Sequence, residues 1–257
     1  MITTILNCYR RPQNLEQQIE AIRAQTVQSS EIWLWVNNHQ DNECVQNMKL
    51  NINKLIWSSH NFKFHGRFTA ALLATTPYVA LFDDDTIPGK NWFKNCLTTI
   101  QLAAKHNIED PILGSAGVRL HSPKYIDHTR VGWPSKNKLI EMVDLVGHAW
   151  FVPHRAIRSL WSYPQISMEN GEDIQLSFNA QRAYGAMTLV PSHHPDDQSM
   201  WGSLQAEKLG TDDVAMSNGK VIPHAEFFRQ RDQIIEKAIN LGWNPLYNQK
   251  RYVTDVV

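Results

Sequence analysis

The chain has 257 residues, of which 42% are hydrophobic and 19% charged, and 25 Lys and Arg balance 25 Asp and Glu to a formal net charge of zero. These values exclude a disordered, fibrous or membrane-spanning chain and fit one large α/β domain. They provide no basic domain or stripe of the kind that binds DNA or RNA, so we expect no nucleic-acid partner.

The first 110 residues alternate predicted strands and helices. The strand predictions are β-branched and apolar runs at 2–9, 31–38, 54–59 and 78–82. Apolar residues spaced three and four apart predict helices after Pro12, after Gly66 and from Trp92 onward. Such alternation with short loops indicates βαβ units and a mostly parallel sheet flanked by helices.

The remaining residues are less regular. Further strands are predicted at 111–120, 143–153 and 186–192, a loop and helix at 167–185, and a terminal helix from about Glu226. The loops at 119–170 and 193–225 are irregular, and Trp133 and Trp201 within them are candidate stacking platforms or packing residues. We find no repeat, low-complexity segment or linker, so we predict a single domain over residues 1–257.

The cysteines and the N-terminus bear on where the protein works. Cys8, Cys44 and Cys96 are odd in number and have no zinc-finger or C-x-x-C spacing, which favours reduced thiols and the cytoplasm. The opening MITTILNCYRRP is a strand pattern, so we expect no signal peptide. No run approaches the ~18 apolar residues of a membrane span, so any work at a membrane would be peripheral.

Three consecutive aspartates follow a predicted buried strand in the stretch YVALFDDDTIPG. Ligands of parallel sheets bind beyond the carboxyl ends of the strands, where Tyr9, Asn37, Asp83, Asp84 and Asp85 all lie. Carboxylate oxygens suit Mg²⁺ or Mn²⁺, and such a cation would offset the repulsion among the three charges. One aspartate before Pro-Gly is most simply a turn residue, but three together predict a metal site.

A second acidic pair, Glu172 and Asp173, opens the predicted helix in NGEDIQLSFNAQRAYG. A carboxylate at this position caps backbone N–H groups and meets the positive end of the helix dipole. That environment also favours an ionised carboxylate, which suits a general base. Of the later histidines we take His194 as the candidate to complete the metal shell, although an exposed loop histidine is the simpler account of each one.

These stretches together resemble the nucleotide-diphospho-sugar glycosyltransferases of the GT-A fold, close to the family-2 type. The likeness spans residues 2–192 and is carried by the order of four segments, each weak alone. They are TTILNCYRRPQNLEQQIEAIRAQT, EIWLWVNN, HGRFTAALLATTPYVALFDDDTIPGKNWF and NGEDIQLSFNAQRAYG. The resemblance implies a Rossmann-like sheet with a nucleotide-binding half at 1–110 and an irregular acceptor-binding half at 111–257.

The resemblance also implies roles in binding the nucleotide. Tyr9, followed by Arg10, would lie by the uracil or other base, and Arg67 would contact the nucleotide near the base or the phosphates. Asn37 and Asn38 stand where the family usually has an acidic residue at the end of the base-binding strand. An amide both donates and accepts hydrogen bonds, so the preferred base is left open, with UDP the first expectation.

The same resemblance implies the chemistry. Asp83 and Asp84 would reach the ribose or the metal, and Asp85 would be the main ligand of Mn²⁺ or Mg²⁺. Asp173, beside Glu172, would deprotonate a hydroxyl of a glycan or other acceptor, and the sugar would transfer with inversion. The exostosin-type family shares an aspartate triplet and a Glu-Asp-Ile-like helix but retains configuration, and it remains an alternative.

Two readings outside the glycosyltransferases also remain. A haloacid-dehalogenase-type phosphatase has an Asp-x-Asp-x-Thr/Val nucleophile motif, and DDDTI departs from it at Ile87. That nucleophile normally ends the first strand of its fold, whereas three predicted strands precede the triplet here. A metal-dependent sugar-binding module would suit the tryptophans and acidic loops, but such modules are mostly all-β.

Overall fold

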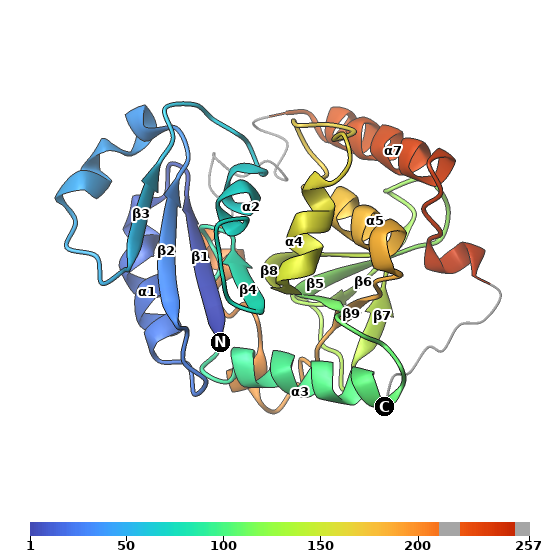
Figure 1. Cartoon of the computed structure of the whole chain (residues 1–257), viewed down its shortest axis with the longest axis horizontal. Coiled ribbons are helices and arrows are strands. Elements are labelled where there is room, and N and C mark those ends of the chain that lie inside the picture. Colours follow the sequence, from blue (N-terminus) through green and yellow to red (C-terminus); the bar gives the residue numbers. More distant parts are fainter. Residues whose placement is uncertain (211–221, 250–257) are drawn as a thin grey trace.

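The computed structural model describes residues 1–210 and 222–249, and its strands form one nine-stranded sheet between layers of helices (Figure 1). The strand order is β3-β2-β1-β4-β8-β5-β9-β7, with β6 paired to β5. The strands are β1 (Ile2–Cys8), β2 (Glu31–Val36), β3 (Lys54–Trp57), β4 (Tyr78–Phe82), β5 (Ile112–Leu120), β6 (His128–Gly132), β7 (Glu141–Val143), β8 (Leu145–Pro153) and β9 (Thr188–Val190).

The direction of the strands divides the sheet. The neighbours β3, β2, β1 and β4 are all parallel, whereas β8 is antiparallel to both β4 and β5. β9 is parallel to β5, and β6 and β7 run antiparallel to their partners. Six of the nine strands, β1 to β5 and β9, therefore share one direction, which confirms the predicted α/β class with a mostly parallel sheet.

Helices cover both faces of the sheet. The α-helices are α1 (Leu15–Arg23), α2 (Gly66–Ala71), α3 (Trp92–Lys105), α4 (His154–Trp161), α5 (Glu172–Tyr184), α6 (Ala206–Leu209) and α7 (His224–Asn240). The 3₁₀ segments are η1 (Pro12–Asn14), η2 (His39–Asn47), η3 (Gln198–Met200) and η5 (Leu246–Asn248). Helices α1 and α3 pack on one face, and α2, α4 and α5 pack on the other (Figure 1).

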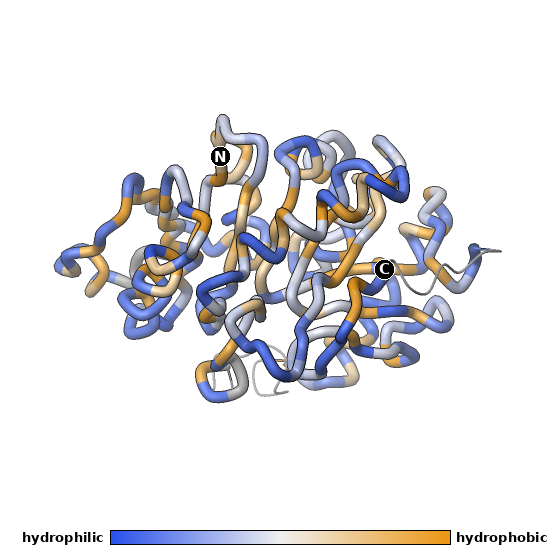
Figure 2. The backbone as a smooth tube through the Cα atoms, turned by 90° about the horizontal axis from the view of Figure 1, so that it is seen from below, coloured by the Kyte–Doolittle hydropathy of each residue, from blue (hydrophilic) through white to orange (hydrophobic). Residues whose placement is uncertain are grey.

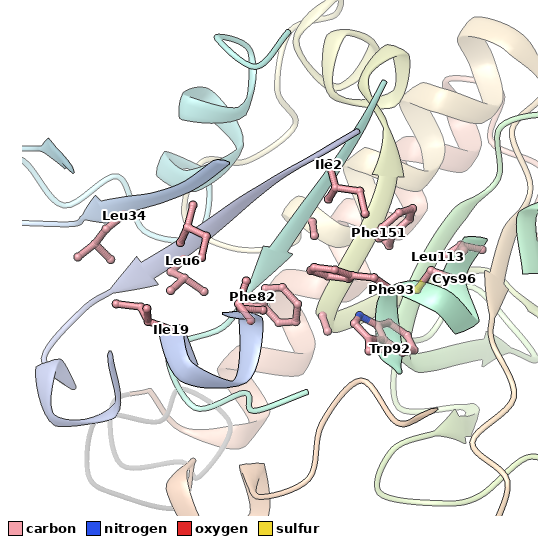
Figure 3. Close-up of a cluster of buried hydrophobic side chains, with 14 of the residues drawn as sticks. Ile2, Leu6, Ile19, Leu34, Phe82, Trp92, Phe93, Cys96, Leu113 and Phe151 are labelled. Atoms are coloured by element: carbon pink, nitrogen blue, oxygen red, sulfur yellow. The ribbon is translucent and has the colours of Figure 1, made fainter. Parts of the chain in front are cut away.

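The core on the α1 and α3 face holds stacked aromatic rings (Figure 3). Phe151 of β8 lies against Phe93 of α3 and Tyr78 of β4, with ring centroids 5.9 and 5.4 Å apart. Hydrophobic segments extend across the whole width of the chain in Figure 2, as expected for a core that follows one continuous sheet. Burial of these rings fixes β8 between the two halves of the sheet.

Four strands and α-helices were not predicted from the sequence: β6, β7, α4 and the short α6. β6 is a partly exposed edge strand and β7 has three residues, so neither has a clear apolar alternation. Helix α4 follows Pro153 directly, and its buried residues continue the apolar run of β8. None of the helices within residues 1–210 and 222–249 combines the length and apolar character that crossing a membrane requires.

Candidate active site

The carboxyl ends of β1, β2 and β4 meet at one edge of the sheet because these strands are parallel neighbours. Tyr9, Asn37 and Asp83 are the residues that follow these strands. Strand β8 runs the other way and brings His148 to the same edge, where the His148 carbonyl accepts a hydrogen bond from the Asp83 amide at 3.0 Å. The predicted gathering of polar residues at this edge is thus present, with a histidine added.

His148 occupies a β-bulge between β8 and β5. The register passes from Gly114 opposite Trp150 to Ala116 opposite Gly147, so two residues of β8 stand against one of β5. His148 itself has a φ of 67°, a left-handed conformation that few residues other than glycine adopt. A bulge turns a side chain away from the regular alternation, and here it directs the imidazole toward the aspartates.

Asp83, Asp85 and His148 form a group that fits a divalent cation. One ligand atom from each lies within 4.8 Å of the others, and His148 Nδ1 is 3.8 Å from Asp83 Oδ2. Within the described residues, the buried His148 Nδ1 has no hydrogen-bond partner. Two carboxylates and an imidazole are a donor set suited to Mn²⁺, and less so to Mg²⁺.

His194, the histidine predicted to complete the metal shell, is not in this group. Its Nδ1 lies 3.6 Å from Asp196 in the loop after β9. Trp201 of the same loop is buried and donates its indole N–H to the His194 carbonyl, so Trp201 is a packing residue. Trp133 is half-buried, and its ring centroid is 4.5 Å from that of His148, so it borders the metal group.

The middle aspartate of the triplet points to a buried arginine. Arg11 Nη1 lies 2.6 Å from Asp84 Oδ1 and 3.2 Å from Asp85 Oδ2. Burial raises the pKa of Asp84 to about 7, and the Arg11 guanidinium opposes the rise. Asn14 also donates to the Asp84 carbonyl at 2.9 Å, so Asp84 anchors the turn while its neighbours face the metal group. Sequence patterns gave no signal for Arg11, because its role depends on a contact across 73 positions.

Arg67, the second residue of α2, links the two acidic clusters. Its Nη1 pairs with Asp83 Oδ1 at 2.6 Å, and its Nη2 lies 3.7 Å from Glu172 Oε1. The guanidinium also stands 4.8 Å from the ring centroid of Trp150, and the side chain is almost fully buried. Burial, together with the charge of Asp173, raises the pKa of Glu172, whereas Arg67 opposes that rise. The structure thus brings the triplet and the Glu-Asp pair to one site.

Asp173 lies in the first turn of α5, as predicted, but it is not the N-cap. That position is Gly171, with a φ of 80°. Asp173 Oδ1 accepts a hydrogen bond from the Ile174 amide at 2.8 Å, and Oδ2 pairs with Arg231 Nη2 at 2.6 Å. The carboxylate is therefore held by an arginine from the far end of the chain, which sequence reasoning missed.

Asn37 holds the loop between β3 and α2. Its amide group donates to Asn61 Oδ1 at 2.8 Å and to the Lys63 carbonyl at 3.0 Å, and its Oδ1 accepts from the Phe62 amide. The buried side chain thus builds the wall of an adjacent pocket of about 570 Å³. The pocket is lined by Asn38, Ser59, His60, Asn61, Phe62, Lys63, Met168 and Glu169.

Two predicted nucleotide-binding residues follow β1. Tyr9 is half-buried and Arg10 is exposed, and the Arg10 guanidinium lies 5.2 Å from the centroid of the Tyr9 ring. Arg10 has a φ of 63°, so the chain turns sharply between this pair and the buried Arg11. The pair therefore stands at the sheet edge, whereas Arg11 points inward.

Comparison with solved structures shows similarity to S. aureus TarS. The structure in complex with UDP aligns with a TM-score of 0.50 and 13% identity, covering 74% of this chain and 57% of that one. The structure of TarS 1–349 gives 0.48 and 13%, covering 74% and 60%. The chain thus spans less than two thirds of these proteins, and at this identity the likeness concerns the fold. None of the curated protein sequences matches the chain significantly.

The sequence profile of the family described as Glycosyl transferase family 2 matches residues 3–157, more than half of the chain. The matched region runs from β1 to α4 and contains the aspartate triplet, Arg67 and His148. This assignment favours the predicted resemblance over a phosphatase or a non-enzymatic sugar-binding module. The chain belongs to glycosyl transferase family 2.

Proposed function

We propose that this glycosyltransferase transfers a sugar from a UDP-linked donor to a hydroxyl group of a glycan or other acceptor, with a divalent metal ion bound in the site. The convergence of Asp83, Asp85 and His148 at the carboxyl edge of the parallel strands is the observation that carries the proposal. The similar fold of S. aureus TarS, whose structure contains UDP, supports the choice of nucleotide.

The donor would lie across the edge of the sheet. Asp83, Asp85 and His148 would hold Mn²⁺ or Mg²⁺, of which the imidazole favours Mn²⁺. When bound, such an ion stabilises negative charge on a departing nucleoside diphosphate. Arg67 and Arg11 keep the aspartates in place by the ion pairs described above.

The nucleoside would occupy the side of the site formed by the first two strand ends. We assign Tyr9 and Arg10 to the base and Asn38 to the rim of the pocket beside it. Asn37 acts through the loop that it fixes, because both of its amide hydrogens are already donated to that loop. Asp84 acts in the same indirect way through Arg11.

Asp173 is the proposed general base. The acceptor oxygen attacks the anomeric carbon, the bond from that carbon to the diphosphate oxygen breaks, and the acceptor proton passes to Asp173. Attack from the face opposite the leaving group inverts the configuration. Glu172 is held toward Arg67, on the donor side of the pair.

We place this reaction in the cytoplasm, with any membrane association peripheral. Cys44 and Cys96 are free thiols in the structure, in line with a reducing compartment. Residues 1–110 would serve mainly the donor and residues 111–257 mainly the acceptor.

The test is isothermal titration of UDP with and without Mn²⁺. Wild-type protein should bind UDP more tightly with Mn²⁺, and Asp85→Asn should lose that gain because it removes a ligand charge. His148→Ala should weaken metal-dependent binding by about tenfold or more, whereas His194→Ala should leave it unchanged. Asp173→Asn should bind UDP like the wild type but no longer transfer sugar.

Two results would contradict the proposal. If Mn²⁺ does not change the affinity for UDP, the proposed metal ion has no part in donor binding. A larger loss in His194→Ala than in His148→Ala would replace the histidine assigned here with the one predicted from the sequence.

A further inference from the structure

Arg231 of the C-terminal helix α7 reaches into the site from outside the matched family region. Its Nη2 lies 2.6 Å from Asp173 Oδ2, and its Nη1 donates to Asn170 Oδ1 at 3.1 Å. One guanidinium therefore binds the first and the last residue of the turn Asn170-Gly171-Glu172-Asp173, which leads into α5. Only 4% of Arg231 is exposed, so this contact is inside the protein.

Two aromatic rings hold the guanidinium from the other side. It stands 4.0 Å from the ring centroid of Tyr125 and 5.6 Å from that of Phe227. The neighbouring Asp232 accepts a hydrogen bond from the Tyr125 amide at 2.6 Å, which ties α7 to the connection between β5 and β6. These aromatic contacts hold the Arg231 side chain in place independently of its ion pair with Asp173, whereas a surface arginine would be flexible.

A buried ion pair of this kind is weak evidence of a stabilising role, because desolvation of the two charges offsets their attraction. Its clearer effect is on the orientation of the Asp173 carboxylate. Burial raises the pKa of the neighbouring Glu172 and lowers the pKa of the nearby His65 to about 4, so neither side chain offers Asp173 a positive charge at neutral pH. Arg67 lies beyond Glu172 and is paired with Asp83. The cation that directly contacts the Asp173 carboxylate is Arg231.

We infer that Arg231 is a positioning residue for catalysis, which holds the Asp173 carboxylate and directs it toward the acceptor. The inference rests on the proposed role of Asp173 as general base. It makes α7 part of the active site as well as part of the packing of the fold.

The experiment measures UDP release from UDP-glucose, UDP-galactose and their N-acetylhexosamine counterparts. Arg231→Gln should lower kcat by about 10²-fold while UDP affinity with Mn²⁺ stays within twofold of the wild type. The loss should fall on kcat and not on UDP binding, because Arg231 contacts Asp173 and none of the three residues of the metal group.

Two further variants separate positioning from structure. Arg231→Lys keeps the charge but should recover only part of kcat, because a lysine cannot bind Asn170 and Asp173 together. Arg229→Gln is the matched control on the same helix. Its exposed pair with Glu226 lies outside the site, so kcat should not change.

The outcomes are distinct. A folded Arg231→Gln with wild-type kcat overturns the positioning role and leaves the proposed function standing. A parallel loss of UDP affinity and kcat also overturns it, because that result indicates general damage. If Arg231→Gln does not fold, Arg231→Lys decides by its kcat, and a kcat equal to that of the wild type overturns the inference. A wild-type protein that releases no UDP from any donor refutes the proposed function, and the role of Arg231 with it.

Discussion

His193, beside the predicted metal histidine, is a buried residue whose hydrogen bonds require a neutral ring. Its Nε2 accepts from the Gly202 amide at 3.2 Å, so its proton must lie on Nδ1, which donates to the Pro191 carbonyl at 2.9 Å. The ring is packed beside Trp92 and Trp201. Burial lowers the pKa of His193 to about 4.

The folded protein should therefore lose stability in acid. A histidine in the unfolded chain becomes protonated below its ordinary pKa of about 6.5, whereas folded His193 stays neutral down to about pH 4. The free energy of unfolding therefore falls as the pH drops below 6.5 and levels off below about 4. By linkage, His193 alone lowers the free energy of unfolding by about 2 kcal/mol between pH 7 and pH 5. The free energy of unfolding, measured with urea at pH 7 and at pH 5, should differ less between the two pH values in His193→Asn than in the wild type.

His194→Asn is the matched control for that measurement, since its side chain is 41% exposed and faces Asp196. It should keep the wild-type difference in unfolding free energy between the two pH values. If the wild type and His193→Asn lose the same free energy of unfolding between pH 7 and pH 5, His193 is not the cause of the acid destabilisation.

Single residues of the site were predicted unevenly. Asp83 and Asp85 lie together with His148 at the ligand edge, because residues directly after a parallel strand reach that edge. Asp84 turns inward because Arg11, distant in sequence, offers it a buried partner. His148 carried no sequence signal, because its direction depends on a bulge between two strands.

At the scale of elements, the turn after the triplet depends on the loop that follows β9. The Gly89 amide donates to the Trp201 carbonyl, and the Leu204 amide donates to the Ile87 carbonyl, both at 2.8 Å. This loop, which we predicted to be a polar loop, thus runs as a strap along the turn. A Cβ at Gly89 would lie 2.5 Å from the carbonyl oxygens of Gln198 and Ser199.

Gly89→Ala should therefore displace the strap or the turn. Because the obstacle is backbone rather than a flexible side chain, we expect a loss of about 1–3 kcal/mol in the free energy of unfolding, measured with urea. Gly147→Ala is the control, since a Cβ there meets no atom within 4 Å. If both variants unfold at the same urea concentration, the contact between the strap and the turn at Gly89 does not stabilise the fold.

The elements near the N-terminus were easier to predict than those in the second half. The strand at Tyr78–Phe82 and the start of the helix at Trp92 match the structure, because long apolar runs and strong helical periodicity leave few alternatives. The second strand ends two residues earlier than predicted, at Val36, since Asn38 turns with a φ of 58°. β6 and β7 were missed because their partners, not their own patterns, define them as strands.

At the scale of the whole molecule, β8 unites the two halves of the sheet. It pairs with β4 on one side and with β5 on the other, although these strands lie far from it in sequence. Phe151 at its centre is completely buried. The division at residue 110 consequently crosses a continuous sheet and stays a prediction about function rather than about folding units.

Phe151→Ala should destabilise the whole chain by about 3–5 kcal/mol through the cavity it leaves. Both halves should unfold in one transition, seen at the same urea concentration by tryptophan fluorescence and far-ultraviolet circular dichroism. The same substitution at Phe62, whose side chain is 42% exposed, should cost about 0.5 kcal/mol or less. Two separate transitions in Phe151→Ala would show that the halves fold independently.

The sequence by itself determined the α/β class, the strand that carries the aspartates and the helix that begins at the Glu-Asp pair. These features follow from local periodicity and from the rule that parallel strands end at one edge. The tertiary structure alone decided the partners of those carboxylates: His148 through a bulge, Arg11 and Arg67 through burial, and Arg231 through the docking of α7. Such partners depend on contacts between distant segments, and no local pattern encodes which distant side chain a buried charge will meet.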